Sequence, residues 1–395
     1  MITVRAICSD ANALRVEVNG AIRGDVNYRA SLAPTERTRA DTGLALTLLP
    51  AMRRDVQLQV EGETSSRLLA GGVPMLQAIF STWSRDLRHV PVHAKDLPQP
   101  ADRGTGVACF FSGGVDSFYT LLANREAITH LIFVHGYDLP LEAKELRTEA
   151  SQAAQAVAAA LSVELVEVET DWRRLVDPHV PWELSHGAML ASVGLLFQES
   201  FRTVLIASSH TYADLLPWGS HPLVDPLWST GLTEFVHHGA DATRIDKCRL
   251  LAENEVAMRH LRVCWENRNG RYNCGECEKC VRTMVNLAAV GALERCETLP
   301  SRIEPAAVAG IKLGDWSDRV FAEENLRAME TTHSHPALEA ALRQCLASDD
   351  VETTLREQLE ASRKVRAAIE SSASWRLTRP LRSAKRAALG LRGRS

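Results

Sequence analysis

The stretch Val107–Asn124, VACFFSGGVDSFYTLLAN, joins a fully apolar run to a helical pattern through a Ser-Gly-Gly loop at 112–114. The apolar run predicts a strand that is covered on both faces, and residues 116–126 predict a helix. Glycines at such a junction permit positive φ and let a ligand approach the backbone closely. The unpaired N–H groups of a helix start attract anions. The stretch therefore predicts a phosphate-binding loop, with a tight, well-capped strand–helix turn as the alternative.

The same alternation continues along the chain. Further apolar strands are predicted at 129–136, 163–170 and 201–209, with helices at 144–161 and 182–200 between them. Apolar strands that alternate with helices indicate a parallel sheet with helices on both faces, an α/β/α sandwich. Ligands of such sheets bind at the carboxyl ends of the strands, where the Ser-Gly-Gly loop lies.

The flanking sequence divides the chain into four parts. Residues 1–100 form a β-rich accessory domain that ends in a helix at 66–87, and Gly43–Met52 is one of its expected strands. The Pro/Gly-rich segment 93–106 marks a domain boundary near residue 100. The α/β domain then covers 101–300 and a helical extension covers 301–370. A basic tail, 371–395, contains seven Arg/Lys and no acid.

Composition restricts the class of protein. A chain of 395 residues exceeds one ordinary core, and its 45% hydrophobic and 24% charged residues are typical of a soluble globular protein. We expect no membrane span, because no apolar run reaches about 18 residues. The N-terminus lacks the pattern of a secretory signal, so a cytoplasmic location is expected. The formal charge of -4, despite the basic tail, argues against nucleic-acid binding as the function.

Four of the nine cysteines are clustered with the spacing C-x9-C-x2-C-x2-C: Cys264, Cys274, Cys277 and Cys280. Four thiolates suit tetrahedral Zn²⁺, and a complete shell of four indicates a structural metal and not a catalyst. The alternative is a set of reduced cysteines without a metal. The other five cysteines are scattered and are expected to be small buried apolar residues.

The string Ser-Gly-Gly-Val-Asp-Ser at 112–117, between an apolar strand and a helix, resembles the pyrophosphate loop (PP-loop) of the N-type ATP pyrophosphatase superfamily. Together with the cysteine pattern about 150 residues later, it makes residues 105–295 similar to the 7-cyano-7-deazaguanine synthases. The resemblance implies a Rossmann-like PP-loop fold with ATP, Mg²⁺ and a zinc knuckle at 264–280. It also implies adenylation of a carboxylate with release of pyrophosphate, followed by displacement of AMP by ammonia.

The chain departs from those synthases in three places. The second strand of the series ends in VHGYDLPLE, where the synthases carry a Gln-Arg-His type segment. The N-terminal and C-terminal flanks have no counterpart in the compact synthases. The resemblance therefore carries over the ATP chemistry and the zinc knuckle but not the deazapurine substrate, and the acceptor is expected to be an unidentified small carboxylate.

The resemblance also implies individual residues. Predicted nucleotide-binding residues are Ser112, Gly113, Gly114, Val115, Asp116, Ser117, His135, Asp138 and Arg244, and predicted catalytic residues are Ser112, Asp116, Ser117 and Lys247. Asp116 is expected to cap N–H groups or to help place Mg²⁺. Arg244 and Lys247 lie three residues apart, on one face of a helix start, and related enzymes often carry a lysine there that reaches toward the phosphates. A solvated helix face is the alternative for this pair, and a helix cap for Asp138.

Two further segments follow strands of the predicted sheet. The long polar loop after the fourth strand offers Ser208, Ser209, His210 and Asp214 for contact with substrate or Mg²⁺. His186 and Gly187, near the start of the third helix, are candidates for the acceptor site, and Tyr137 accompanies His135 at the adenosine side. Each of these residues has a surface or structural role as its alternative.

The sequence thus favours an ATP-dependent, AMP-forming C–N ligase. The N-terminal Met-Ile-Thr offers no cysteine nucleophile of a glutaminase, so ammonia is expected free or from a partner protein. One alternative is sulfur transfer, which requires a reactive thiol at Cys109 or Cys248. Another is a non-catalytic nucleotide-binding scaffold in a polysaccharide or defence pathway.

The basic tail and the oligomeric state are separate questions. Residues 374–382, SWRLTRPLR, resemble a tail often seen on bacterial polysaccharide-assembly proteins such as glycosyltransferases. Seven cations with Trp375 suit peripheral contact with an anionic membrane surface or an acidic partner, and a disordered basic end is the alternative. Superfamily relatives are often dimers, so a homodimer is expected.

Overall fold

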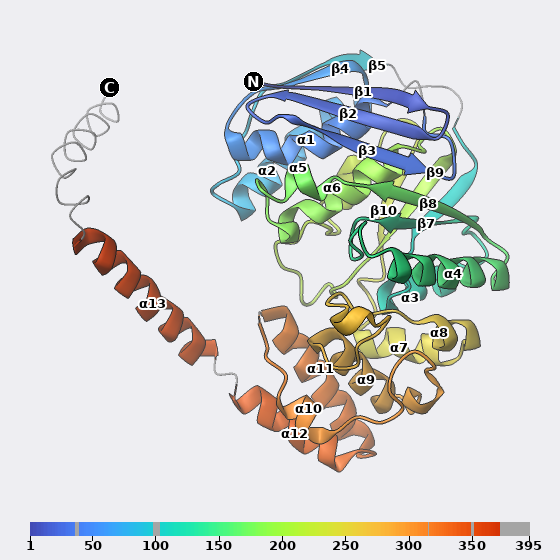
Figure 1. The fold of residues 1–395 in the computed structure, drawn as a ribbon, viewed down its shortest axis with the longest axis vertical. Coiled ribbons are helices and arrows are strands. Elements are labelled where there is room, and N and C mark those ends of the chain that lie inside the picture. The colour runs from blue at the N-terminus through green and yellow to red at the C-terminus, as the bar shows by residue number, and fades with distance from the viewer. Residues whose placement is uncertain (36–38, 98–102, 315, 349–350, 372–395) are drawn as a thin grey trace.

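The computed structural model describes residues 1–35, 39–97, 103–314, 316–348 and 351–371 (Figure 1). The predicted basic tail lies almost entirely outside this range. A single ten-stranded sheet runs through the molecule in the order β10-β9-β6-β7-β8-β3-β2-β1-β4-β5. Helices pack on both of its faces, so the predicted α/β class is confirmed.

Five strands form the parallel half of the sheet: β6 (Gly106–Phe110), β7 (His130–His135), β8 (Glu164–Thr170), β9 (Phe201–Ala207) and β10 (Glu234–His238). Their spatial order, β10-β9-β6-β7-β8, reverses direction between β6 and β9. That reversal is the topological switch point at which open α/β sheets bind their ligands. The strand β10 was not predicted, because EFVHH has only five residues and three of them are polar or charged.

The N-terminal strands extend the same sheet and do not form a second one. They are β1 (Ile2–Asp10), β2 (Ala13–Gly20), β3 (Gly24–Ala30), β4 (Leu58–Ser65) and β5 (Val92–Leu97). Antiparallel pairing of Tyr28 with Thr170 and of Ala30 with Val168 joins β3 to β8. Across the junction, the hydroxyl groups of buried Tyr28 and Ser192 lie 3.1 Å apart. Both sides of the boundary near residue 100 therefore share one sheet and one core.

The strand predicted at Gly43–Met52 was wrong, because this segment lies in the helix α1 (Ala40–Arg54). Every residue from Ala40 to Met52 is buried. A helix that is buried on all sides lacks the polar face on which recognition of a helical period depends. The helix predicted at 66–87 is confirmed as a π-helical turn at Arg67–Gly72 followed by α2 (Val73–Trp83).

Two layers of helices cover the sheet. One face carries α1, α2 and α6 (Trp182–Leu195), with the short α5 (Arg173–Val176) beside them. The other carries α3 (Val115–Ala123), α4 (Lys144–Ala160), α7 (Arg244–Ala252), α8 (Glu255–His260) and α9 (Glu278–Ala289).

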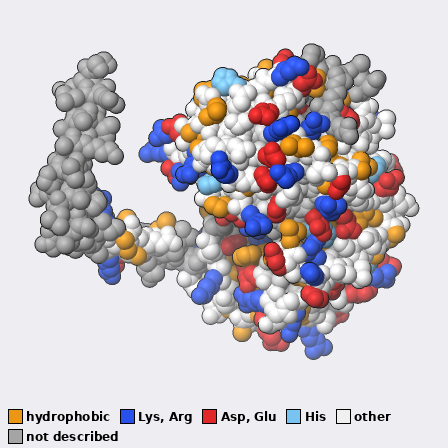
Figure 2. Space-filling model, turned by 45° about the horizontal axis from the view of Figure 1, so that its top comes forward, with side chains coloured by type: hydrophobic (Ala, Val, Ile, Leu, Met, Phe, Trp, Pro, Cys, Tyr) orange, Lys and Arg blue, Asp and Glu red, His pale blue; other side chains and the backbone are white. Residues whose placement is uncertain are grey.

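The predicted C-terminal extension is helical: α10 (Pro305–Ala309), α11 (Trp316–Thr332), α12 (Pro336–Ser348) and α13 (Val351–Ser371). Residues of α10, α11 and α12 join the core under α7 and α9, whereas α13 stands apart from the body in Figure 1. Within the described residues, no helix combines the length and the apolar character needed to cross a membrane. Acidic and basic side chains are interspersed over the face shown in Figure 2.

Candidate nucleotide site and metal centre

The Ser-Gly-Gly loop lies at the carboxyl end of β6, beside the switch point of the sheet. Gly113 has φ +78°, a backbone conformation that favours glycine. In the described part of the chain, no side chain accepts a hydrogen bond from the N–H groups of residues 115–117 in the first turn of α3, whereas Thr243 and Asp246 form a capping box at the start of α7. The start of α3 therefore leaves backbone donors for a ligand.

Ser112 and Ser117 give the loop its shape. The buried Ser117 hydroxyl accepts a hydrogen bond from the Ser112 N–H (3.3 Å) and donates one to the Gly114 carbonyl (3.0 Å). The Ser112 Oγ accepts from the Gly114 N–H at 3.4 Å, and its side chain is exposed. Ser117 thus fixes the turn from below, while Ser112 is open to the site.

Three charged residues meet beneath the loop. Asp116 Oδ2 lies 2.5 Å from Arg244 Nη1, and Asp116 Oδ1 lies 3.0 Å from Lys247 Nζ. Lys247 also donates to the Ser208 carbonyl at 2.6 Å and is only 1% exposed. The one-turn spacing of Arg244 and Lys247 therefore brings both cations to one carboxylate, as their predicted shared face requires.

The pKa of Asp116 shows which charge state this arrangement favours. Burial alone would raise the pKa of the carboxyl, but Arg244 and Lys247 outweigh burial and hold it well below its usual range. Burial likewise opposes the charge of Arg244, and Asp116 raises the Arg244 pKa above its ordinary value. Two buried cations share the Asp116 carboxylate, and the nearby Glu324 carboxylate adds to the rise of the Arg244 pKa.

Two cavities that share lining residues lie next to these groups. A cavity of about 240 Å³ is lined by Ser112, Gly114, Val115, Asp116, Ser117, Asp138, His186, Ser209 and Arg244, among others. A larger cavity of about 1180 Å³ shares Asp116, Asp138, Ser209 and Arg244 with it and adds His210. Most of the predicted site residues are therefore gathered around one space.

Several predicted residues do not line either cavity: Gly113, His135, Lys247, Ser208, Asp214 and Gly187. Lys247 lies behind the cavity wall, where it donates hydrogen bonds to Asp116 Oδ1 and to the Ser208 carbonyl. Asp214 accepts a hydrogen bond from the Thr211 hydroxyl (2.6 Å). A Cβ on Gly187 would lie 1.9 Å from the Gly219 carbonyl oxygen, so Gly187 permits close packing of α6.

His135 belongs to a polar network between β7, β8 and α4. Its Nε2 lies 3.0 Å from Glu167 Oε2, and the Ser151 hydroxyl donates to the same carboxylate at 2.7 Å. The hydrogen bond with His135 lowers the pKa of Glu167 to about 2. Burial of the carboxylate acts in the opposite direction, and the hydrogen bond from Ser151 lowers the pKa further. The structure therefore places this predicted adenosine contact in an interior network outside the cavities.

His186 lies in the wall of the small cavity with a defined tautomer. Its Nε2 accepts a hydrogen bond from the Ser220 N–H (3.2 Å), so its Nδ1 donates to the Trp182 carbonyl (2.9 Å). Burial lowers the pKa of His186. Both ring nitrogens are engaged, so His186 links the start of α6 to the loop at 218–220.

Aromatic side chains form another wall, and of these the sequence analysis named only Tyr137. Tyr137, Trp182 and Trp218 line both cavities. Trp182 stacks on Trp172 with ring centroids 5.7 Å apart, and the Arg173 guanidinium lies 4.9 Å from the Trp182 ring centroid. Tyr137 was predicted to lie with His135 on the adenosine side, and no local spacing connects it to residues 172–218.

The C-terminal extension closes the site from the side of α7. Phe321 of α11 lines the large cavity, with the Arg282 guanidinium 4.1 Å and the Arg244 guanidinium 5.7 Å from its ring centroid. The Glu324 carboxylate accepts a hydrogen bond from the Ile245 N–H at 2.7 Å. This helix therefore holds the start of α7, from which Arg244 and Lys247 project.

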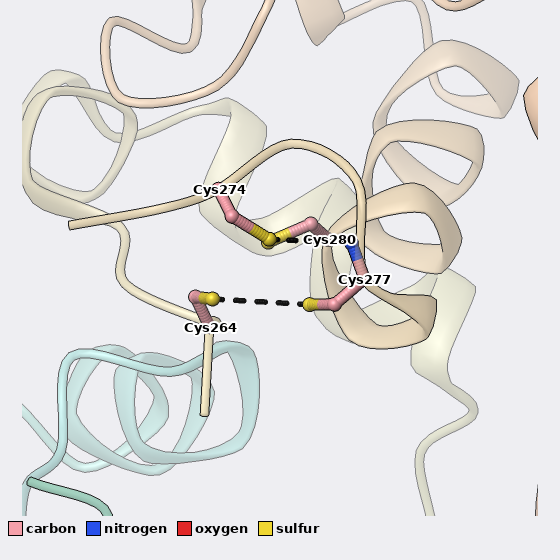
Figure 3. Close-up of side chains that lie close together, drawn as sticks. All are labelled: Cys264, Cys274, Cys277 and Cys280. Carbon is pink, nitrogen blue, oxygen red and sulfur yellow. Dashed lines mark hydrogen bonds between the residues drawn. The ribbon is translucent and has the colours of Figure 1, made fainter. Parts of the chain in front are cut away.

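The four clustered cysteines are buried and lie together at the start of α9 (Figure 3). Their sulfur atoms all lie within 4.8 Å of one another, and the Cys264–Cys277 and Cys274–Cys280 sulfurs are each 3.8 Å apart. Zn–S bonds of about 2.3 Å in a tetrahedron place sulfurs about 3.8 Å apart, whereas a disulfide requires about 2.05 Å. The cluster fits a four-thiolate metal site for an ion such as zinc.

Cys109 and Cys248, the thiols required for sulfur transfer, are both fully buried. Burial raises the pKa of each thiol to about 12. Neither is among the residues that line the two cavities. Both therefore resemble inert core thiols more than the exposed thiolates of reactive cysteines.

Comparisons with protein-family models, curated proteins and solved structures found no match to this chain.

Proposed function

We propose that this protein is an ATP-dependent, AMP-forming ligase of the PP-loop type. It activates a carboxylate as an acyl-adenylate for attack by ammonia or another nitrogen nucleophile. The observation that carries the proposal is the buried Asp116–Arg244–Lys247 arrangement beneath the uncapped start of α3. Buried cations and free backbone donors at one point are what a polyphosphate requires.

Cleavage between the α and β phosphates depends on positioning and on neutralising charge more than on proton transfer. The loop at 112–117 supplies backbone donors, and Arg244 supplies a buried guanidinium at the cavity wall. Lys247 acts through Asp116 and adds its charge from below. Asp116 itself serves as the shared anchor of both cations. Each Asp116 oxygen accepts a hydrogen bond from one of these cations, and the Mg²⁺ role expected from the sequence stays a prediction.

The two cavities have room for a nucleotide and a second reactant. Ligand sites commonly measure about 300–1,000 Å³, and the larger cavity alone measures about 1180 Å³. The phosphates would lie at the small cavity near Ser112, and a carboxylate acceptor in the larger one. In this arrangement Zn²⁺ bound at Cys264–Cys280 has a structural role, because four thiolates fill its coordination shell.

Two alternatives are less well supported. Sulfur transfer requires a reactive thiol, and Cys109 and Cys248 are buried with raised pKa values. A nucleotide-binding scaffold would share the loop and the charges but would not turn ATP over. Product analysis separates the scaffold from the ligase.

The test incubates the purified full-length chain with ATP, MgCl₂, ammonium chloride and the small-molecule fraction of a bacterial extract. We expect AMP and pyrophosphate in equal amounts, with turnover lost in Lys247→Met. Arg249→Gln is the matched control, because Arg249 projects from the same helix and its side chain is 61% exposed. Formation of ADP and phosphate, or binding of ATP without any turnover, would refute the ligase.

A further inference from the structure

Arg262 is a buried residue against the Ser-Gly-Gly loop that neither the motif nor the cysteine pattern singles out. Its backbone N–H donates to the Gly113 carbonyl at 2.8 Å. A Cβ on Gly113 would lie 3.4 Å from Arg262 Cβ, and one on Gly114 would lie 3.6 Å from the Arg262 carbonyl oxygen. The side chain is 4% exposed and lines the small cavity together with Ser112.

The charge of Arg262 is not neutralised by the described part of the protein. No carboxylate there lies within ion-pair distance of its guanidinium, whereas Arg244 and Arg282 have Asp116 and Glu278 as partners. Arg262 Nη2 donates to the neutral Asn267 Oδ1 (2.8 Å), and the Tyr272 ring centroid lies 5.8 Å from Cζ. Its Nε is buried without an acceptor.

An unpaired buried guanidinium is costly unless it meets an anion. We propose that Arg262 binds the phosphate chain of the ligand held by the loop, as an anion-binding residue additional to Arg244. The inference rests on the proposed function, because it takes that anion to be the polyphosphate of the nucleotide. A guanidinium suits this task because it presents several donors in a plane to phosphate oxygens.

The cysteine cluster holds Arg262 in place. Cys264 follows two residues later, and Asn273 Oδ1 accepts hydrogen bonds from the Val263 and Cys264 N–H groups (2.9 and 3.1 Å). The Asn267 N–H donates to Cys264 Sγ at 3.2 Å. The metal-binding segment therefore fixes both Arg262 and its neighbour Asn267 at the loop.

The experiment measures binding of inorganic pyrophosphate and of ATP to the full-length chain by calorimetry. Arg262→Gln removes the charge, and we expect it to weaken pyrophosphate binding about tenfold to a hundredfold. Arg262→Lys keeps the charge without the planar donors and should bind with intermediate affinity. Arg259→Gln is the control, because Arg259 precedes the segment and has a side chain that is 55% exposed; it should bind as wild type.

Asn267→Asp provides a second variant in case Arg262→Gln does not fold. It places a carboxylate beside Arg262 Nη2 without altering Arg262, so it neutralises the guanidinium. If Arg262 binds the anion, Asn267→Asp weakens pyrophosphate binding. If Arg262 only supports the fold, the new ion pair leaves binding unchanged, and thermal unfolding occurs at the same or a higher temperature.

The outcomes separate this inference from the proposed function. Wild-type affinity in folded Arg262→Gln, or in both Arg262→Lys and Asn267→Asp, overturns the role of Arg262 even if ATP is converted to AMP. Pyrophosphate binding that depends on Arg262 supports that role even if ATP is never cleaved. A wild-type chain that binds neither pyrophosphate nor ATP overturns both proposals.

Discussion

Replacing Asp116 with Asn removes the anion on which the site is built while preserving the shape of the side chain. Arg244 Nη1 lies 2.5 Å from Asp116 Oδ2, and Lys247 Nζ lies 3.0 Å from Asp116 Oδ1. In the variant, the two positive charges would remain close together without the carboxylate that they share. Arg244 is 7% and Lys247 is 1% exposed, so water cannot replace the missing charge. Removing one partner of a buried ion pair costs about 3–5 kcal/mol. Lys247 keeps the Ser208 carbonyl as an acceptor, so we expect a loss near the lower end, about 3 kcal/mol.

Urea unfolding followed by tryptophan fluorescence measures this loss, since Trp172 and Trp228 are completely buried. Asp177→Asn is the control: Asp177 pairs with Arg173 at 2.8 Å, but both side chains are over one-third exposed. Exposed pairs contribute about 0.5 kcal/mol or less. The double variant Asp116→Asn/Lys247→Met should lose less stability than the sum of the two single variants, because it does not leave the Lys247 charge unpaired.

The pH dependence gives a separate check. The Asp116 pKa lies far below its unfolded value of about 4. Its contribution is therefore complete above about pH 5 and is lost only as pH falls through the lowered pKa. The deficit of Asp116→Asn should stay constant from pH 5 to pH 8. A deficit below about 1 kcal/mol, or one that changes within this range, would refute the proposed arrangement of charges.

Two more predictions concern the metal and a buried acid. Thiol modification of the native chain should release about one equivalent of zinc; Cys277→Ser should abolish this release, whereas Cys296→Ser, a buried cysteine outside the cluster, should leave it intact. Burial raises the pKa of Asp41 to about 7, against hydrogen bonds from the Ser65 N–H and Gln198 Nε2. Because the folded pKa exceeds the unfolded one, the free energy of unfolding should fall as pH rises from about 4 to about 7 and then level off. Urea titrations at several pH values should show that Asp41→Asn lacks this decrease in the free energy of unfolding. The same pH dependence in the wild type and in Asp41→Asn would contradict the prediction.

Most of the parallel half of the fold could be predicted because apolar segments such as β6 alternate with helices along the chain. β6 and β7 lie where the pattern placed them. Recognition failed where burial removed the pattern: α1 is buried all round and contains Gly43 and Pro50, so its apolar run resembled a strand. The pairing of β3 with β8 joins residues about 140 apart, and no local sequence feature specifies it.

The site was partly predictable for a similar reason. Residues 112–117 form one continuous segment, and Arg244 and Lys247 are only three residues apart. Each of these two groups could therefore be recognised from its local spacing. The partners that complete the cavity do not share such spacing: Trp182 and Phe321 come from distant helices. Arg262 lies next to a recognisable cysteine motif, but its importance depends on the missing carboxylate, which only the folded structure reveals.

These distant partners connect the C-terminal extension to the chemistry proposed for the loop. Glu324 of α11 accepts from the Ile245 N–H, and Phe321 packs against the Arg244 guanidinium. The position of Arg244 in turn determines how Asp116 is neutralised, and Asp116 belongs to the first turn of α3. A segment that the sequence separated from the α/β domain is therefore part of the structure that holds the charges proposed to bind phosphate. The same argument applies to the cysteine cluster, which reaches the loop through Arg262.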